Sequence, residues 1–280
     1  MQLPRYEPVD TPDSLLQEAL VLAEDAADAA ATISLSYFRQ PMDVRNKAGD
    51  GLFDPVTEAD KKVEQLIREK VATRFPEHNF FGEEGDNTQQ GSEADRTHTW
   101  VVDPIDGTRA FITGMPAWGT LIALFDGEQV VLGLMDQPFL QERFIGYGGS
   151  AYLCTKQGEM QQLATRDTAS VDAAIIQCTT PEMFKDPAEL ASFNRLVSRV
   201  AMARYGGDCY AYVLLAMGYI DAVVESDLQP YDIQAMIPIV TGAGGVVSDW
   251  QGGSAVAGGS IVASANPALH AQLLDNLANS

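Results

Sequence analysis

The segment Trp100-Val101-Val102-Asp103-Pro104-Ile105-Asp106-Gly107-Thr108 places two carboxylates three residues apart, where an apolar strand meets a turn. Its first three residues predict the end of a buried strand, and Pro104 is expected to stop that strand because proline has no N–H to donate. Gly107 and Thr108 predict the start of a short helix, whose first N–H groups can bind an anion. Carboxylates beside an anion-binding helix start indicate Mg²⁺-assisted phosphate chemistry.

This segment alone also fits an ordinary loop with a helix cap, because Asp-Pro and Asp-Gly pairs are common in turns. Three further acidic segments, far apart in the sequence, lie at element ends of the same kind. They are Asp54-Pro55-Val56-Thr57-Glu58-Ala59-Asp60, Phe80-Phe81-Gly82-Glu83-Glu84 and Pro230-Tyr231-Asp232-Ile233-Gln234-Ala235. Together the four segments favour a shared metal site over separate loops.

In their order along the chain, the four segments resemble those of the inositol monophosphatase superfamily of Mg²⁺-dependent phosphatases, and the resemblance covers residues 47–250. Three stretches are similar to the branch that dephosphorylates histidinol phosphate: Thr108-Arg109-Ala110-Phe111-Ile112-Thr113-Gly114, Tyr205-Gly206-Gly207-Asp208-Cys209-Tyr210-Ala211-Tyr212 and Tyr231-Asp232-Ile233-Gln234-Ala235-Met236-Ile237-Pro238. The resemblance implies an α/β fold, a layered αβαβα sandwich with the metal site between two halves. The expected halves are residues 1–148, with most metal ligands, and residues 149–280, with Asp232 and the residues that select the substrate.

The resemblance also implies a ligand set. Glu83, Asp103 and the backbone carbonyl of Ile105 would bind one Mg²⁺, and Asp103, Asp106 and Asp232 would bind a second. Asp103 would then bridge the two ions. Family members of this kind hold two or three Mg²⁺ per active site, which is the cofactor content expected here.

Catalytic roles follow from the same resemblance for Asp54, Thr57, Glu83 and Thr108. Thr57 and Asp54 match the positions that orient the attacking water. Thr108 and the N–H groups of Gly107 and Thr108 would meet the phosphate at the helix start. The four residues that begin with Thr57 also have the spacing of a capping box, and a capped helix start can coexist with a catalytic Thr57.

The substrate pocket is expected to combine the phosphate-binding turn with residues from the second half. Its members are Gly107, Thr108, Arg109, Gly207, Asp208, Cys209, Glu225 and Asp232. Carboxylates in that pocket suit an alcohol that carries a positive charge, as histidinol phosphate does. They would also suit a polyol, whose hydroxyl groups can donate hydrogen bonds to them. Three roles fit Arg109: it could bind phosphate, hold Asp208 across the pocket, or lie on the surface.

The leading hypothesis is therefore the hydrolysis of L-histidinol phosphate to L-histidinol and phosphate, a step of histidine biosynthesis, by a metal-activated water. Inositol 1-phosphate or another small sugar or nucleotide phosphate is the alternative substrate. A catalytically silent binding module of the same fold is the alternative outside enzymes. The carboxylate at every implied ligand position speaks against a silent module.

Hydrophobic periodicity predicts the remaining elements, whose mixture fits a layered arrangement of helices and sheets. The first half is expected to contain helices over residues 11–39 and 57–75 and strands over 79–82 and 99–103. Antiparallel strands should follow at 119–125, 130–135, 142–147 and 151–155, with a hairpin turn at Asp126-Gly127. Beyond residue 171, strands are expected at 173–178, 221–225, 246–250 and 260–264, and helices at 188–199, 208–217, 232–241 and 267–278.

The composition agrees with an enzyme that has a sizeable core, since 46% of the 280 residues are hydrophobic. No apolar run approaches the ~20 residues that cross a bilayer, and residues 1–5 lack signal-peptide features. A cytoplasmic protein without a membrane partner is expected. The cysteines Cys154, Cys178 and Cys209 are scattered and odd in number, so reduced thiols are expected, with Cys209 as a small packing residue.

The charge restricts the partners. With 18 basic against 39 acidic side chains, the formal net charge is −21. Nucleic acid is a poor partner, since phosphate-backbone binding needs a basic stripe. The expected partner is a small phosphate monoester, drawn in by bound cations and by any amine it carries. A homodimer is implied by the resemblance; the apolar residues 120–125 and 151–154 fit either a subunit contact or buried core.

Overall fold

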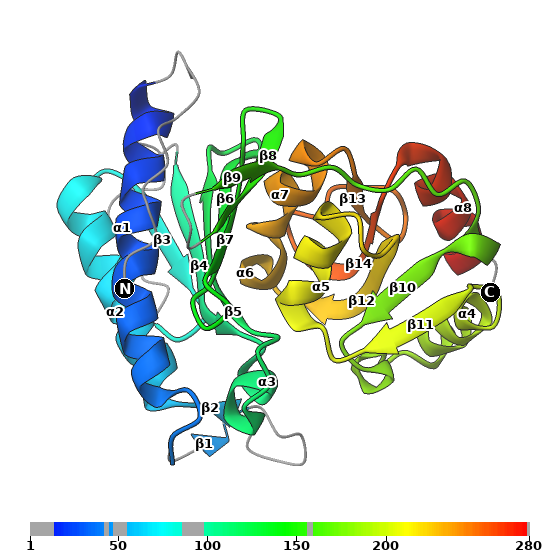
Figure 1. Cartoon of the computed structure of the whole chain (residues 1–280), viewed down its shortest axis with the longest axis horizontal. Coiled ribbons are helices and arrows are strands. Elements are labelled where there is room, and N and C mark those ends of the chain that lie inside the picture. The colour runs from blue at the N-terminus through cyan, green and yellow to red at the C-terminus, as the bar shows by residue number, and fades with distance from the viewer. Residues whose placement is uncertain (1–13, 42–44, 47–54, 86–97, 156–158, 279–280) are drawn as a thin grey trace.

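The computed structural model describes residues 14–41, 45–46, 55–85, 98–155 and 159–278. Within these residues, helices and sheets alternate in five layers, as the sequence predicts (Figure 1). The outer helices α1 (Ser14–Tyr37) and α2 (Glu58–Arg74) cover one face of the first sheet. Helices between the two sheets form the central layer: α5 (Asp208–Ala216), α6 (Pro230–Ile233) and α7 (Met236–Gly242). The far layer contains α4 (Pro187–Val197) and α8 (Pro267–Ala278).

The first sheet has seven strands in the order β3-β4-β5-β6-β7-β8-β9. Their bounds are Asn79–Gly82, Thr99–Asp106, Gly119–Phe125, Val130–Gln137, Glu142–Tyr147, Ser150–Thr155 and Met160–Gln162. β3 and β4 are parallel and the other neighbours are antiparallel, which confirms the predicted antiparallel run. Because β8 and β9 pair with this sheet, its residues extend beyond position 148. The division into halves at 148 remains a proposal.

Strand β4 continues past Pro104, so the predicted stop at this proline is wrong. Asp103 pairs with Leu121 and Asp106 pairs with Gly119, so three steps along β4 match two steps along β5. This bulge accommodates the missing N–H of Pro104. Leu121 and Gly119 are two residues apart and share a face of the sheet, so their partners Asp103 and Asp106 share a face as well. Without the bulge, the two acids would point to opposite faces.

The second sheet has five strands in the order β11-β10-β12-β14-β13. Their bounds, in the same order, are Met202–Tyr205, Ile175–Cys178, Ala222–Leu228, Gly259–Ser264 and Val246–Asp249. Four of them were predicted, and the edge strand β11 was not, because three of its four side chains are exposed and no apolar alternation marks it. Smaller elements are β1 (Arg45–Asn46), β2 (Pro55–Val56), α3 (Thr108–Thr113) and two 3₁₀ turns, Val171–Ala173 and Pro181–Met183.

The helix predicted over residues 232–241 is divided into α6 and α7. Pro238 has no N–H for the carbonyl of Gln234, which accepts instead from the N–H of Ile237 in a tighter turn. The α7 backbone then lies directly on the first sheet, because a Cβ on Gly133 would overlap the Ala235 carbonyl and a Cβ on Gly146 would overlap Pro238. These glycines therefore fix where α6, with Asp232, meets the sheet.

The apolar stretches that sequence analysis assigned to either core or subunit contact lie in the core. Leu121, Ile122, Ala123 and Leu124 are fully buried in the centre of the first sheet, and Ala151 is fully buried in β8. The three cysteines are buried free thiols, as predicted. Among the described residues, no helix combines the length and apolarity that a bilayer crossing requires.

Candidate active site

The metal ligands predicted from separate segments converge where β3, β4 and α6 meet. One carboxylate oxygen each from Asp103, Asp106 and Asp232 lies within 4.8 Å of the others. Glu83 directly follows β3, whose last residue Gly82 pairs with Val102 of β4, so Glu83 comes next to Asp103. Consistent with this placement, Glu83 acts electrostatically on both Asp103 and Asp232.

The clustered acids perturb one another strongly. Burial raises the pKa of Asp103 well above its ordinary value, and like charge on Glu83 and Asp106 raises it further. Burial raises the pKa of Asp106, helped by Asp232, and burial raises that of Asp232. Three such carboxyls do not all ionise at neutral pH without nearby positive charge. The cluster therefore takes up either protons or cations.

Backbone hydrogen bonds aim these carboxylates. The N–H of Ile105 donates to Asp103 Oδ1 at 3.0 Å, and the N–H of Gln229 donates to Asp232 Oδ2 at 2.7 Å. The N–H of Cys209, in the first turn of α5, donates to Asp106 Oδ2 at 2.8 Å. Asp106 thus connects the first sheet to the central helices, and each acid keeps an oxygen that can bind a cation.

The predicted phosphate-binding turn follows β4 immediately. Gly107 caps α3 with a left-handed backbone (φ 79°), which favours glycine. A Cβ at Gly107 would also lie 2.8 Å from the Ala117 carbonyl and 3.1 Å from the Asp208 side chain. The Thr108 hydroxyl donates to the Ile105 carbonyl at 3.1 Å. Since the first N–H groups of a helix have no partner within it, those of Gly107 and Thr108 can serve an anion.

The C-terminal half contributes further acidic groups. Burial, together with Asp106 and Glu225, raises the pKa of Asp208 to about 8, and Arg109 lowers it in part. Arg109 itself is exposed. Glu225 is buried and accepts from the Thr179 N–H at 2.8 Å and the Tyr212 hydroxyl at 2.9 Å. Glu225 is therefore held rigidly, with the lone pairs left on its oxygens available to a ligand.

The predicted capping box at the start of α2 is present. Asp60 accepts from the Thr57 N–H at 2.9 Å and from the Thr57 hydroxyl, which in turn accepts the Ala59 N–H at 3.1 Å. Burial raises the pKa of Asp60 to about 6, and Asp60 adds like charge to Asp103. Thr57 therefore lies beside the cluster. Asp54, its predicted catalytic companion, falls outside the described residues.

The donor set fits divalent cations such as Mg²⁺, which prefer carboxylate and carbonyl oxygens. The repulsion among the carboxyls is one sign of a cation-binding site. Asp60 gives a second, because its Oδ1 atom is buried and has no hydrogen-bond partner in the described part of the chain. A buried oxygen of this kind is expected to bind a water or an ion.

Sequence reasoning gave no role to two residues that the structure places here. Tyr212 holds Glu225, and Glu64, on α2, accepts the N–H of Glu84. A signal was available for Glu64. Asp60, Glu64, Ile67 and Val71 follow the three-and-four spacing of one helix face, and an acid on an apolar face calls for a buried partner.

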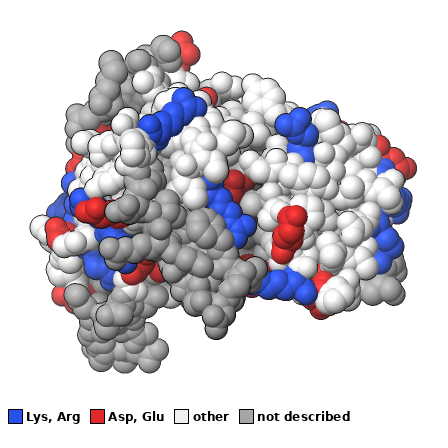
Figure 2. All heavy atoms as spheres, turned by 90° about the horizontal axis from the view of Figure 1, so that it is seen from below, with Lys and Arg blue, Asp and Glu red and all other residues white. Residues whose placement is uncertain are grey.

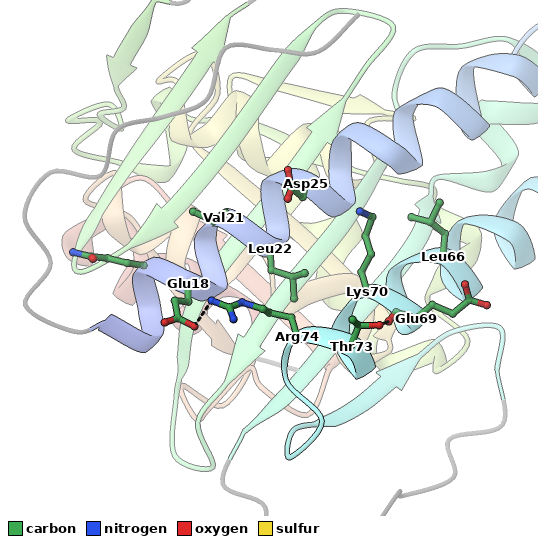
Figure 3. Close-up of a pocket in the computed structure, with 10 residues that line it drawn as sticks. Glu18, Val21, Leu22, Asp25, Leu66, Glu69, Lys70, Thr73 and Arg74 are labelled. Carbon is green, nitrogen blue, oxygen red and sulfur yellow. Dashed lines mark hydrogen bonds and ion pairs between the residues drawn. The ribbon is translucent and has the colours of Figure 1, made fainter.

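Other surface features lie away from this cluster. A groove between α1 and α2 is lined by residues such as Val21, Leu22 and Leu66 and bordered by the Arg74–Glu18 ion pair (Figure 3). On the face seen in Figure 2, Lys and Arg side chains are scattered and form no continuous patch among the described residues. That face does not offer the basic stripe that nucleic acid needs.

Comparison with known proteins agrees with the fold and the acidic cluster. The model of the inositol monophosphatase family matches residues 15–280. The chloroplastic bifunctional phosphatase IMPL2 of Arabidopsis thaliana is 39% identical over 280 residues, covering 96% of this chain and 78% of that protein. The histidinol-phosphatase of Chlorobaculum parvum is 36% identical over 270 residues, covering 96% and 98%. A solved inositol monophosphatase from Zymomonas mobilis aligns with a TM-score of 0.81 at 36% identity, covering 95% and 99%.

The chain belongs to the inositol monophosphatase family. It is a phosphoric monoester hydrolase with a carboxylate cluster suited to the divalent metal that this family uses. The predicted family, fold class and enzyme class are confirmed. The predicted roles of individual site residues stay predictions, as does the cytoplasmic location, since one relative is chloroplastic.

The raised pKa values predict how stability depends on pH. A carboxyl whose pKa is raised by folding stabilises the protein at low pH and loses that contribution as pH rises through the folded value. For Asp208, with a folded value near 8, and for the raised Asp106, the loss begins near pH 4, the unfolded value, and is complete soon after pH 8. We expect the melting temperature in EDTA to fall by on the order of 5 °C from pH 6 to 8, measured by scanning fluorimetry.

Mg²⁺ should counteract this loss, because the cation replaces the protons. Stabilisation by Mg²⁺ should therefore grow from pH 6 to 8. Asp232→Asn removes one of the repelling charges and should make the decline in EDTA shallower. A melting temperature that does not change with pH in the metal-free protein would contradict the mutual repulsion inferred for the cluster.

Proposed function

We propose that this phosphatase hydrolyses L-histidinol phosphate to L-histidinol and phosphate, with two or three Mg²⁺ in its active site. The observation that carries the proposal is the placement of Asp208 and Glu225 close to the metal-binding acids. When Mg²⁺ or a substrate amine offsets the neighbouring acids, ionised Asp208 and Glu225 favour an alcohol with a positively charged amine and can accept an imidazole N–H. The name of the Chlorobaculum parvum relative supports the same substrate.

Glu83, Asp103 and the Ile105 carbonyl would hold one Mg²⁺, and Asp103, Asp106 and Asp232 would hold a second. Bound Mg²⁺ would acidify the attacking water and stabilise the charge that develops on the leaving oxygen. The bulge at Pro104 supports this assignment because it puts Asp103 and Asp106 on one face. The hydrogen bonds from Ile105 and Cys209 keep both carboxylates in place before any ligand binds.

Thr57 would orient the attacking water. Its hydroxyl has one proton, which goes to Asp60, and two lone pairs, of which one accepts the Ala59 N–H. The remaining lone pair can accept a hydrogen bond from water. The capping box thus prepares Thr57 for this role, with Asp54 as its proposed companion.

The N–H groups of Gly107 and Thr108 would bind the phosphate, while Gly207 and Cys209 shape the wall that faces it. A Cβ on Gly207 would collide with the Gln177 side chain and lie 2.8 Å from Ala211 Cβ, so only glycine fits there. Arg109 lies close enough to lower the pKa of Asp208, which supports its role in holding Asp208 across the pocket.

The substrate is tested by comparing kcat/KM for histidinol phosphate and inositol 1-phosphate under saturating Mg²⁺. We expect histidinol phosphate to be favoured by at least about tenfold, the scale of one charge-assisted hydrogen bond. An advantage of tenfold or more for inositol 1-phosphate would overturn the proposed substrate and leave the phosphatase assignment intact.

Asp208→Asn is the matched variant for this comparison. It should lower kcat/KM for histidinol phosphate by about tenfold and change the value for a neutral ester such as phenyl phosphate much less. An equal loss on both esters would assign Asp208 a role other than recognition of the amine.

Inositol 1-phosphate is the second candidate. It is favoured by the 36% identity to a solved inositol monophosphatase from Zymomonas mobilis over nearly the whole chain. A polyol can donate hydroxyl hydrogen bonds to Asp208 and Glu225 without carrying a charge. The kinetic comparison above decides between the two substrates.

A homodimer is also part of the proposal. The buried strands β5 and β8 leave their apolar residues in the core of one chain, so the contact would use other surfaces. Light scattering after size exclusion should give twice the 30.2 kDa chain mass. A mass of one chain would contradict the dimer.

A further inference from the structure

Glu64 is a buried carboxylate that contacts the turn carrying Glu83. The residue is 2% exposed and lies on the inner face of α2. Its Oε2 accepts the backbone N–H of Glu84 at 2.6 Å, and its Oε1 accepts from Arg68 Nη2 at 2.7 Å. One partner of Glu64 is therefore the peptide group that joins Glu83 to Glu84.

Two glycines let the turn close tightly around this carboxylate. A Cβ on Gly82 would lie 2.5 Å from the Cδ and Oε2 atoms of Glu64. A Cβ on Gly85 would lie 2.5 Å from Glu64 Oε1 and closer still to Arg68. Any larger residue at either position would displace the carboxylate or the turn. The turn at residues 82–85 therefore packs closely against the Glu64–Arg68 ion pair.

Arg68 restrains Glu64 from the other side. The Glu64–Arg68 pair has the i, i+4 spacing and the order that suit a helix. The Arg68 guanidinium also lies 4.3 Å from the centre of the Phe80 ring, in β3. The pair thus anchors α2 to β3, the strand that leads directly to Glu83.

We propose that Glu64 is a positioning residue that fixes the 82–85 turn and thereby sets the affinity of Glu83 for the divalent cation. Glu83 acts on Asp103 and Asp232, so a shift of the turn changes the cation site itself. Groups that orient a metal ligand typically contribute 10-fold to 100-fold in metal affinity. The proposal rests on the proposed metal site and is independent of the substrate.

The test is Glu64→Gln, which keeps the shape of the side chain but replaces one acceptor oxygen with an NH₂ group. Either the Glu84 N–H or Arg68 then loses its acceptor. We expect the dissociation constant for Mg²⁺, from calorimetric titration of the metal-free protein, to rise about tenfold or more. The Mg²⁺ concentration for half-maximal activity should rise in parallel, with kcat at saturating Mg²⁺ within about threefold of the parent.

Glu69→Gln is the matched control, because Glu69 is exposed on the same helix and its side chain accepts a hydrogen bond from Gln65, one turn earlier. It should leave Mg²⁺ affinity unchanged. An unchanged affinity in Glu64→Gln would overturn the proposal.

If Glu64→Gln does not fold, Glu64→Asp replaces it, since the aspartate carboxylate is one methylene too short to reach the Glu84 N–H. A raised dissociation constant for Mg²⁺ would again support the proposal, and an unchanged one would again overturn it. Failure of the parent protein to bind Mg²⁺ would instead contradict the metal site.

Discussion

Asp103→Asn is expected to lower kcat at saturating Mg²⁺ by at least about 10³-fold while the metal-free protein remains folded. Asp103 is 2% exposed and is the proposed ligand of both ions. Asparagine keeps its size but provides one neutral oxygen in place of a carboxylate. Because the change also removes like charge from beside Glu83, Asp106 and Asp232, the melting temperature in EDTA should not fall.

The two readouts separate lost chemistry from lost structure. Asp126→Asn is the control: Asp126 accepts the N–H groups of Glu128 and Gln129 in the turn after β5, and asparagine can make the same bonds. This turn lies at the opposite end of β5 from the residue that pairs with Asp106. The kcat of Asp126→Asn should match that of the parent protein. More than a tenth of the parent kcat in Asp103→Asn would contradict the bridging role.

Arg143→Met should destabilise the protein by about 3–5 kcal/mol, the cost of breaking a buried ion pair. The Arg143 side chain is 2% exposed and donates to Asp136 of β6 at 2.8 Å and to Asp28 of α1 at 2.9 Å. It links the outer helix layer to the first sheet. Burial raises the pKa of Asp136 even with Arg143 beside it, so the variant leaves two uncompensated carboxyls. Urea unfolding in the presence of Mg²⁺ measures the loss.

The exposed Arg74–Glu18 pair provides the comparison, since it also joins α1 to a neighbouring element (Figure 3). Its N–O distance is 2.7 Å, but its side chains are 57% and 50% exposed. Arg74→Gln should cost less than about 1 kcal/mol, because water screens exposed pairs. Equal losses in the two variants would show that burial does not determine the energy of these pairs.

Much of the layered fold could be predicted because its elements carry clear periodic signals. The long helices, the antiparallel run β5–β8 and the last helix lie close to the predicted ranges. The exceptions have physical causes. β9 has three exposed side chains and β11 is mostly exposed, so neither shows the apolar alternation of a half-buried strand.

Pro104 shows where a local rule fails. Proline does remove a donor from the ladder, but the pairing of Asp106 with Gly119 lets β4 resume after the bulge. A bulge depends on the partner strand, and the sequence around Pro104 does not describe that partner. The bulge at Pro104 also brings Asp103 and Asp106 to the same face of the sheet, so this local irregularity shapes the site.

The identities of the ligands could be predicted from motifs, whereas their convergence depends on tertiary contacts. Asp232 reaches β4 because Gly133 and Gly146 allow α7 to lie against the first sheet. Glu64 was missed because its role depends on a backbone N–H twenty residues later in the chain. Sequence motifs identify the residues that bind the metal more readily than the residues that hold those side chains in position.

We infer that acids from distant segments jointly bind divalent cations. Anomalous diffraction from a crystal soaked in Mn²⁺, which takes the same oxygen ligands as Mg²⁺, is the test of this binding. We predict anomalous peaks bounded by Asp103, Asp106 and Asp232, with Glu83 contacting one ion. A crystal with no peak at this cluster, or with these four carboxylates directed to separate places, would contradict a shared cation site.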